Sequence, residues 1–265
     1  MTDTPDISIV MPCYQQRPFL EEAVRSVLDQ EGVAVELLVM DPGSTDGSRE
    51  LLHQLHDYYG ARLRLHFAPD EGQADAVNRG LALARGRVLG WLNSDDRLRP
   101  GALRHVLAQL QDPGPRWLYG RGGIIDEHNR PISRYIVWYK NFRGRRFSRD
   151  KLLTEDFIPQ MATFWTRPLW EAVGGLDKER HLAMDYDLFL RFANLAEPLV
   201  LPAYLADFRV HGAAKSSLRI DEHLAEAYAI AREHAVGRGW RGKLALLLHR
   251  LYAERTRLVY RWIKP

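Results

Sequence analysis

Short β-rich runs alternate with amphipathic stretches through the first half of the chain. Four runs are typical of buried strands: Ile7 to Met11, Glu36 to Met40, Arg62 to Phe67 and Arg87 to Leu92. The stretches between them predict helices: Pro18 to Gln30, Asp46 to Tyr58 and Gln73 to Ala84. This alternation predicts an α/β fold, with helices flanking a mainly parallel central sheet.

The second half of the chain has a less regular pattern. A helix from about Pro100 to Leu110 is followed by a strand-like region, Trp117 to Trp138, and by a basic loop, Asn141 to Arg149. Further on, three helices and a strand pair are predicted: helices over Pro168 to Val173, Met184 to Phe192 and Leu218 to Val236, and strands over Leu199 to Val210.

The chain of 265 residues has one cysteine, Cys13, so it forms no intramolecular disulfide and carries no sign of an oxidising compartment. Its first residues, MTDTPD, lack the pattern of a secretory signal, and no apolar run approaches the ~18 residues of a membrane span. We therefore expect a cytoplasmic setting, with any membrane contact peripheral at the inner face.

The last stretch of the chain is strongly basic. One acid, Glu254, accompanies these bases: Arg238, Arg241, Lys243, Arg250, Arg255, Arg257, Arg261 and Lys264. Apolar residues at helical spacing among them could lie on an anionic membrane, pack on the same domain or form a homodimer. The few aromatics and the modest net charge of +3 do not require a nucleic-acid partner, and none is expected.

Two adjacent acids, Asp95 and Asp96, follow the fourth predicted strand. Ligands of open α/β sheets gather at the carboxyl ends of strands, so the position itself suggests a site. Neighbouring carboxylates repel one another unless a cation or proton donors satisfy them, and Mg²⁺ and Mn²⁺ prefer oxygen ligands. An exposed turn or a helix cap would explain the same pair without a metal.

A second turn, Asp41-Pro42-Gly43-Ser44-Thr45-Asp46-Gly47, joins the second strand to a helix. Its glycines let a ligand approach the backbone, and Asp41 could accept a hydrogen bond from the imide N–H of uracil or thymine. Plain turn chemistry explains Asp46 as a helix cap. The sequence after the first strand, Pro12 to Gln16, is neither a dinucleotide-binding nor a Walker loop, and Cys13 within it is expected to be a small buried residue.

Read together, these segments resemble inverting family-2 glycosyltransferases of the GT-A fold. The matching pieces fall in the right order over residues 7 to 217: Ser8 to Pro12, Val39 to Gly47, Glu71 to Gly80, Gly90 to Asp96, Pro159-Gln160, Phe164-Trp165, Gly174 to Asp177, Met184 to Leu188 and Phe208 to His211. Asn93, Pro42 and Met184 replace acids that many relatives carry.

The resemblance implies roles for particular residues. Those implied to hold the donor are Pro12, Tyr14, Asp41, Gln73, Asn78, Asp95, Arg209 and Lys215. Asp96 is the implied direct metal ligand, with Asp95 towards the ribose or a metal-bound water and His211 near the metal. Asp185 matches the catalytic base, whereas Asp187 would point elsewhere. Gln160 and Trp165 are expected in the acceptor cleft, although core packing explains them equally well.

The resemblance also implies an activity and a domain organisation. We expect a catalytic domain over 1–216, with a donor-binding half of about 1–115 and an acceptor half of about 116–216, and a helical basic tail over 217–265. The expected reaction is metal-dependent, inverting sugar transfer from a nucleotide donor, UDP before dTDP or GDP, with Mn²⁺ or Mg²⁺. The acceptor would be a saccharide or lipid-linked hydroxyl, in cell-surface polysaccharide or glycolipid synthesis.

Two other functions would suit part of the same pattern. A catalytically silent nucleotide-sugar-binding or scaffold protein could keep the fold without the chemistry, although the retained carboxylates argue against it. A sugar-phosphate nucleotidyltransferase would need a glycine-rich basic loop after the first strand, and this chain has none.

Overall fold

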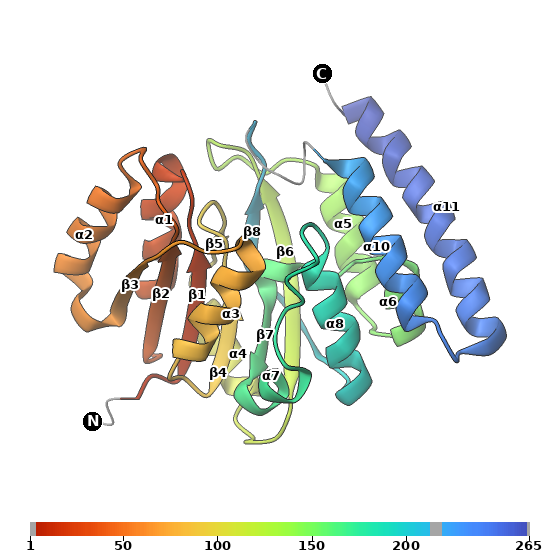
Figure 1. Cartoon of the computed structure of the whole chain (residues 1–265), viewed down its shortest axis with the longest axis horizontal. Coiled ribbons are helices and arrows are strands. Elements are labelled where there is room, and N and C mark those ends of the chain that lie inside the picture. Colours follow the sequence, from red (N-terminus) through yellow and green to blue (C-terminus); the bar gives the residue numbers. More distant parts are fainter. Residues whose placement is uncertain (1–3, 213–218, 264–265) are drawn as a thin grey trace.

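The computed structural model describes residues 4–212 and 219–263, and an eight-stranded sheet runs through the centre of that part of the chain (Figure 1). The strand order is β3-β2-β1-β4-β7-β6-β8-β5. The strands are β1 Ile7–Pro12, β2 Val35–Asp41, β3 Leu63–Phe67, β4 Val88–Trp91, β5 Arg97–Leu98, β6 Trp117–Ile125, β7 Thr163–Thr166 and β8 Leu199–Arg209.

The two halves of the sheet differ in strand direction. β3, β2, β1 and β4 are all parallel, as the alternation of strands and helices predicted. Beyond β4 the pairing is mixed, because β4 with β7, β7 with β6 and β8 with β5 are antiparallel while β6 and β8 are parallel. The sheet is therefore mainly parallel only in its first half, and the strand order changes direction between β1 and β4, where ligands of open α/β sheets bind.

Helices cover both faces of the sheet, each over its own hydrophobic core. One face carries α1 Arg17–Leu28, α2 Ser48–Tyr59 and α4 Ala102–Gln109. The other face carries α3 Gln73–Leu83, α6 Arg149–Thr154, α7 Arg167–Val173, α8 Met184–Leu195 and α10 Ile220–His234. In α1, Leu20, Val24 and Val27 are buried at the spacing of one helix face.

Helix α3 lies close against β1 because Gly80 has no side chain. A Cβ at this position would come within 2.5 Å of Val10 Cγ1, closer than carbon atoms approach one another. This close contact fixes the distance between α3 and the sheet. The first residue of α3, Gln73, lies beside the carboxyl end of β4, where it contacts Asn93.

The region after β6 differs from the prediction. The strand-like region predicted over 117–138 ends as a strand at Ile125, and α5 Arg134–Gly144 occupies its last part and the first part of the predicted basic loop. Tyr119 donates a hydrogen bond to the Gly144 carbonyl and Asn141 donates one to the Gly122 carbonyl, so α5 is held along β6. The strand pair predicted over 199–210 is the single strand β8, and β7 was not predicted.

The two C-terminal helices pack on the rest of the molecule. α11 Gly239–Ile263 lies along α6 and α10 at one end of the molecule, where Arg238 and Asp150 form an ion pair of 2.6 Å (Figure 1). Ala245 and His249 are the buried side of α11. No helix in the described part of the chain is long and apolar enough to cross a membrane.

Candidate active site

A cavity of about 900 Å³ opens at the carboxyl ends of β1, β2 and β4. The donor-side residues predicted from the sequence that line it are Pro12, Tyr14, Gln73, Asp95 and Asp96. The lining also contains Gln160 and Asp185, together with residues of α5, α10 and the loop after α6. The structure thus brings Asp95 and Asp96 to the same cavity as Asp185, which follows Asp96 by 89 positions in the sequence.

Asp96 is the most deeply buried acid of this cavity, with 1% of its surface exposed. Its Oδ1 accepts a hydrogen bond of 2.9 Å from the Arg209 backbone N–H, whereas its buried Oδ2 has no partner in the part of the chain that the structure describes. Burial, and then the charge of Asp95, raise the pKa of Asp96 well above its ordinary value. A bound cation would strongly stabilise the negative charge of such a buried carboxylate.

Asp95 and His211 lie beside this buried carboxylate. Asp95 Oδ2 is 3.1 Å from His211 Nε2, and the histidine ring packs on Phe19 with centroids 4.7 Å apart. Among residues 4–212 and 219–263, no three His, Cys, Asp or Glu side chains gather closely enough to hold a metal ion alone. The protein therefore offers a partial oxygen ligand set, which suits Mg²⁺ or Mn²⁺ only when a substrate's phosphates and water complete the coordination.

Asn93 joins the acidic motif to α3. Its Oδ1 accepts hydrogen bonds from Gln73 Nε2 at 2.7 Å and from Trp91 Nε1 at 2.8 Å. Gln160 Nε2 donates to the Trp91 carbonyl at 2.8 Å from the other side. Gln73 and Gln160 thus line the cavity, and the amide of each is hydrogen-bonded to the segment from Trp91 to Asn93, just before Asp95 and Asp96.

Arg209 does not lie where a diphosphate contact was predicted. Its side chain is buried, it is absent from the cavity wall, and its guanidinium donates to the Asp95 carbonyl, the Asp126 carbonyl, Asn129 Oδ1 and Glu22 Oε2 at 2.7–3.2 Å. Arg209 therefore does not line the cavity, because its guanidinium donates to four acceptors inside the fold. Its role is to hold the backbone of Asp95 and Asp96 in place.

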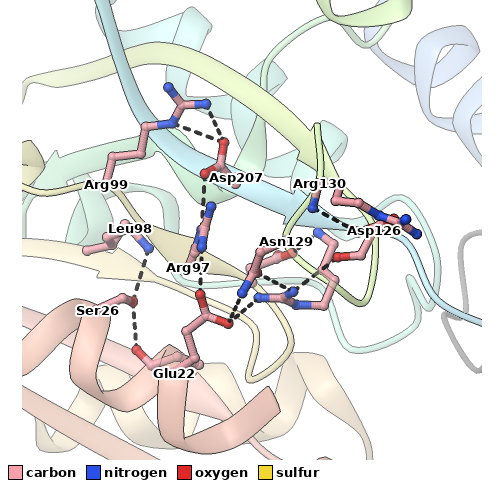
Figure 2. A network of polar contacts seen from close by, with 12 residues as sticks. Glu22, Ser26, Arg97, Leu98, Arg99, Asp126, Asn129, Arg130 and Asp207 are labelled. Atoms are coloured by element: carbon pink, nitrogen blue, oxygen red, sulfur yellow. Dashed lines mark hydrogen bonds and ion pairs between the residues drawn. The ribbon is translucent and has the colours of Figure 1, made fainter. Parts of the chain in front are cut away.

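The Arg209 contacts are part of a longer ionic network. Figure 2 shows Glu22 of α1 reaching Arg97, which in turn reaches Asp207 of β8. Asp207 also accepts two hydrogen bonds from Arg99, at 2.6 and 3.0 Å. The network ties α1, β5 and β8 together directly behind the acidic motif, so breaking it would leave charges buried without partners.

The turn after β2 is closed by Asp41. Asp41 Oδ1 accepts hydrogen bonds from Gly43 N–H, Ser44 N–H and Arg49 Nε at 2.8–2.9 Å, which is the plain turn chemistry that the sequence left open. Its buried Oδ2 has no partner in the described residues, and its neighbours Met40 and Pro42 line the cavity. Asp41 itself is 1% exposed and does not line the cavity, so its carboxylate shapes the turn behind the donor side.

Tyr14 and Cys13 follow β1 but differ in their exposure. The Tyr14 side chain is 60% exposed at the cavity, whereas Cys13 is buried. Burial, helped by the charge of Asp41, raises the pKa of the Cys13 thiol to about 12. Cys13 is thus a small buried residue rather than a nucleophile, as the sequence suggested.

Asn78 and Trp165 are also corrected by the structure. Asn78 exchanges two hydrogen bonds of 2.8 and 2.9 Å with the backbone of Leu176, so it joins α3 to the loop before α8 rather than lining the cavity. Trp165 is 1% exposed and its ring stacks on Trp170 at 5.9 Å. Trp165 therefore belongs to the core, which was the alternative to an acceptor contact. Lys215 lies outside the described residues.

Asp185 is the second residue of α8 and lines the same cavity as Asp95 and Asp96. Its Oδ1 accepts a 2.9 Å hydrogen bond from the Tyr186 N–H. Burial raises the pKa of Asp185, and the charges of His223 and Lys140 oppose that shift. Asp187 points away, as predicted: its carboxylate lies 2.8 Å from Arg191 Nε and 3.1 Å from His234 Nε2.

Three further residues of this cavity, Asp156, Lys140 and His223, were not found from the sequence. Burial, followed by the charge of Asp185, raises the pKa of Asp156 to about 7. His223 comes from α10, and burial lowers its pKa. No local pattern singles out any of the three, because they come from three different segments that meet only in the folded chain.

Helix α10 also holds the start of α8 in place. Glu226 Oε1 accepts hydrogen bonds from the Leu182 and Ala183 N–H groups at 3.0 and 2.8 Å, just before the helix that carries Asp185. Helix α10 lies in the predicted tail, residues 217–265, and contributes His223 to the cavity. The predicted tail therefore supplies part of the candidate site.

Comparison with known proteins identifies relatives of the chain and of the fold. Residues 8–172, more than half of the chain, match the model of "Glycosyl transferase family 2". The chondroitin synthase of Pasteurella multocida is 26% identical over 230 residues, which are 86% of this chain but only 23% of that synthase. The chain thus spans less than a quarter of this relative's length.

Two solved structures share the fold at low sequence identity. S. aureus TarS 1-349, in complex with UDP-GlcNAc, superposes with a TM-score of 0.69 and 14% identity over 88% of this chain and 67% of that chain. The mannosyltransferase PcManGT of Pyrobaculum calidifontis, in complex with GDP-Man and Mn²⁺, gives 0.66 and 19% over 93% of this chain and 74% of that chain.

Proposed function

Since the chain belongs to glycosyl transferase family 2, we propose that it transfers a sugar from a nucleotide-diphosphate donor to a hydroxyl group, with inversion at the anomeric carbon. The observation that carries this proposal is that Asp95 and Asp96 line the same cavity as Asp185. The similarity to a chondroitin synthase supports a role in polysaccharide synthesis, and the proposal extends this to cell-surface polysaccharide or glycolipid made on the cytoplasmic side.

The donor occupies the side of the cavity formed by β1, β2 and α3. Asp41 closes the turn whose residues Met40 and Pro42 line this wall, and we place the base beside that turn, with UDP favoured over dTDP or GDP. UDP-GlcNAc and GDP-Man in the two structural neighbours support a donor of this class. Tyr14, Pro12 and Gln73 line the rest of that wall.

Mn²⁺ or Mg²⁺ fits the acidic motif because Asp96 offers a buried carboxylate oxygen without a partner, beside Asp95 and His211. The cation would neutralise the charge that builds up on the departing nucleoside diphosphate. Asp96 and, directly or through water, Asp95 would hold the cation, with His211 beside Asp95.

Asp185 acts as general base on the acceptor. Its carboxylate takes the proton of the attacking hydroxyl as the hydroxyl oxygen forms a bond to the anomeric carbon. The bond between that carbon and the diphosphate oxygen breaks on the opposite face, so the configuration inverts and no covalent enzyme intermediate forms. The acceptor is a saccharide or lipid-linked hydroxyl that enters past Gln160.

Asp156 sets the pH range in which this base works. Burial raises the pKa of both Asp156 and Asp185, so kcat/KM should rise with pH through an acidic limb that lies above the ordinary range of an aspartate. We expect Asp156→Asn to move this acidic limb to lower pH, because it removes the negative charge beside Asp185. A pH profile of both proteins measures the shift, and a limb that stays in place contradicts the assignment.

Donor binding is tested by calorimetric titration of UDP, dTDP and GDP with and without Mn²⁺. We expect one nucleotide to bind, at least about tenfold more tightly with the metal than without it. Absence of binding to all three under every condition would favour a scaffold protein that kept the fold without the chemistry.

A further inference from the structure

Helix α5 has three different sides. Val137, Lys140 and Asn141 line the active-site cavity. A second side faces α11 and the loop after α6, where Arg143 pairs with Glu155 at 3.2 Å and the Arg255 guanidinium lies 4.2 Å from the Tyr139 ring centroid. The third side borders the cavity-lining side and covers nothing in the described part of the chain.

The third side is a row of exposed aromatic residues, Tyr135, Trp138 and Phe142, one helical turn apart from each other. They are 71%, 58% and 54% exposed. The Trp138 and Phe142 rings stack with centroids 5.5 Å apart, and the Tyr135 ring lies 5.9 Å from Trp138. We call these three residues the aromatic row. Such a contiguous exposed apolar surface marks a binding face.

The aromatic row is surrounded by cations. Arg134, Arg145 and Arg146 are exposed, and within residues 4–212 and 219–263 none of them forms an ion pair. The one acid between residues 134 and 151 is Asp150, and it is paired with Arg238. Exposed Trp and Tyr rings among arginines without ion-pair partners are typical of the boundary between lipid headgroups and acyl chains.

We propose that the aromatic row docks on an anionic lipid surface, so that the cavity receives its acceptor from that surface. The acceptor class rests on the proposed function, whereas lipid docking does not. The Trp138 and Phe142 rings stack on each other, so one face of each ring is partly covered and less available for stacking on a sugar ring, whereas the row as a whole stays exposed. The unpaired cations supply attraction to negative lipid.

Sedimentation with phospholipid vesicles tests the docking face. We expect the full chain to bind phosphatidylglycerol-containing vesicles and not pure phosphatidylcholine vesicles, without any nucleotide present. The double variant Trp138→Glu and Phe142→Glu should bind at least about tenfold more weakly. Both positions are exposed, so the variant should still bind nucleotide with unchanged affinity, which separates lost docking from misfolding and from failure of the proposed function.

The matched control lies on α11, which exposes its own apolar row, Trp240, Leu244, Leu247, Leu251 and Leu258. Leu247→Glu with Leu251→Glu adds the same charge and should leave vesicle binding intact. The proposal is overturned if the wild type binds no vesicles, if the α5 variant binds as well as the wild type, or if only the α11 variant loses binding. It is also overturned if light scattering shows a dimer that Trp138→Glu dissociates, because the row would then join two copies of the chain.

Discussion

Replacing Asp185 by Asn is expected to lower kcat by about 10²- to 10⁴-fold, the range in which a positioned general base contributes. The amide has nearly the same shape and can keep the contact to the Tyr186 N–H, but it cannot take a proton from the acceptor hydroxyl. Nucleotide binding should be unchanged because Asp185 lies on the acceptor side of the cavity. Steady-state kinetics with calorimetry of the nucleotide separates the two effects.

The matched control for Asp185→Asn is Asp187→Asn on the same helix. Although burial opposes it, the hydrogen bond from His234 and the charge of Arg191 lower the pKa of Asp187, so the Asp187 carboxylate is a structural ion. Its replacement should cost stability at neutral pH and leave kcat within a few-fold of wild type. Equal losses of kcat in both variants would argue that the helix position, not the Asp185 carboxylate, matters.

Replacing Asp96 by Asn is expected to remove the metal dependence of nucleotide binding and to lower kcat/KM by about 10³-fold, the equivalent of about 4 kcal/mol of charge stabilisation. The carboxylate oxygen without a partner is lost, while the remaining amide oxygen can still accept from the Arg209 N–H, so the local fold should persist. Titration of the nucleotide at several Mn²⁺ concentrations measures the loss.

Asp95→Asn distinguishes the roles of the two neighbouring acids. Asp95 contacts His211, and its backbone carbonyl, not its side chain, accepts from Arg209. We therefore expect a smaller loss of metal-dependent binding than for Asp96→Asn. If Asp95→Asn has the larger effect, the assignment of Asp96 as the direct ligand is reversed.

The regular part of the fold could be predicted because its signals are local. Strands β1 to β4 and helices α1 to α3 follow from hydrophobic periodicity, and the position of Asp95 and Asp96 at a strand end follows from the same pattern. Helix α5 was missed because Tyr135-Ile136-Val137-Trp138 has the residue types of a strand. Contacts with β6 and α11 override that preference.

The direction of a side chain could not be predicted where packing decides it. Arg209, Asn78 and Trp165 stand in motifs of the site, but their side chains turn into the fold, towards Glu22, the Leu176 backbone and Trp170 respectively. A long cationic, amide or aromatic side chain finds its lowest free energy where its polar atoms are paired and its apolar surface is buried.

The sequence by itself determined the strand-helix alternation, the acidic motif at the end of β4 and the acid at the start of α8. Only the tertiary structure decided which other groups face Asp185. Asp156 and His223 come from separate segments, 67 positions apart, and each is unremarkable in its local sequence. Their meeting depends on α10 packing against α8, and long-range packing of this kind leaves no periodic signal in the sequence.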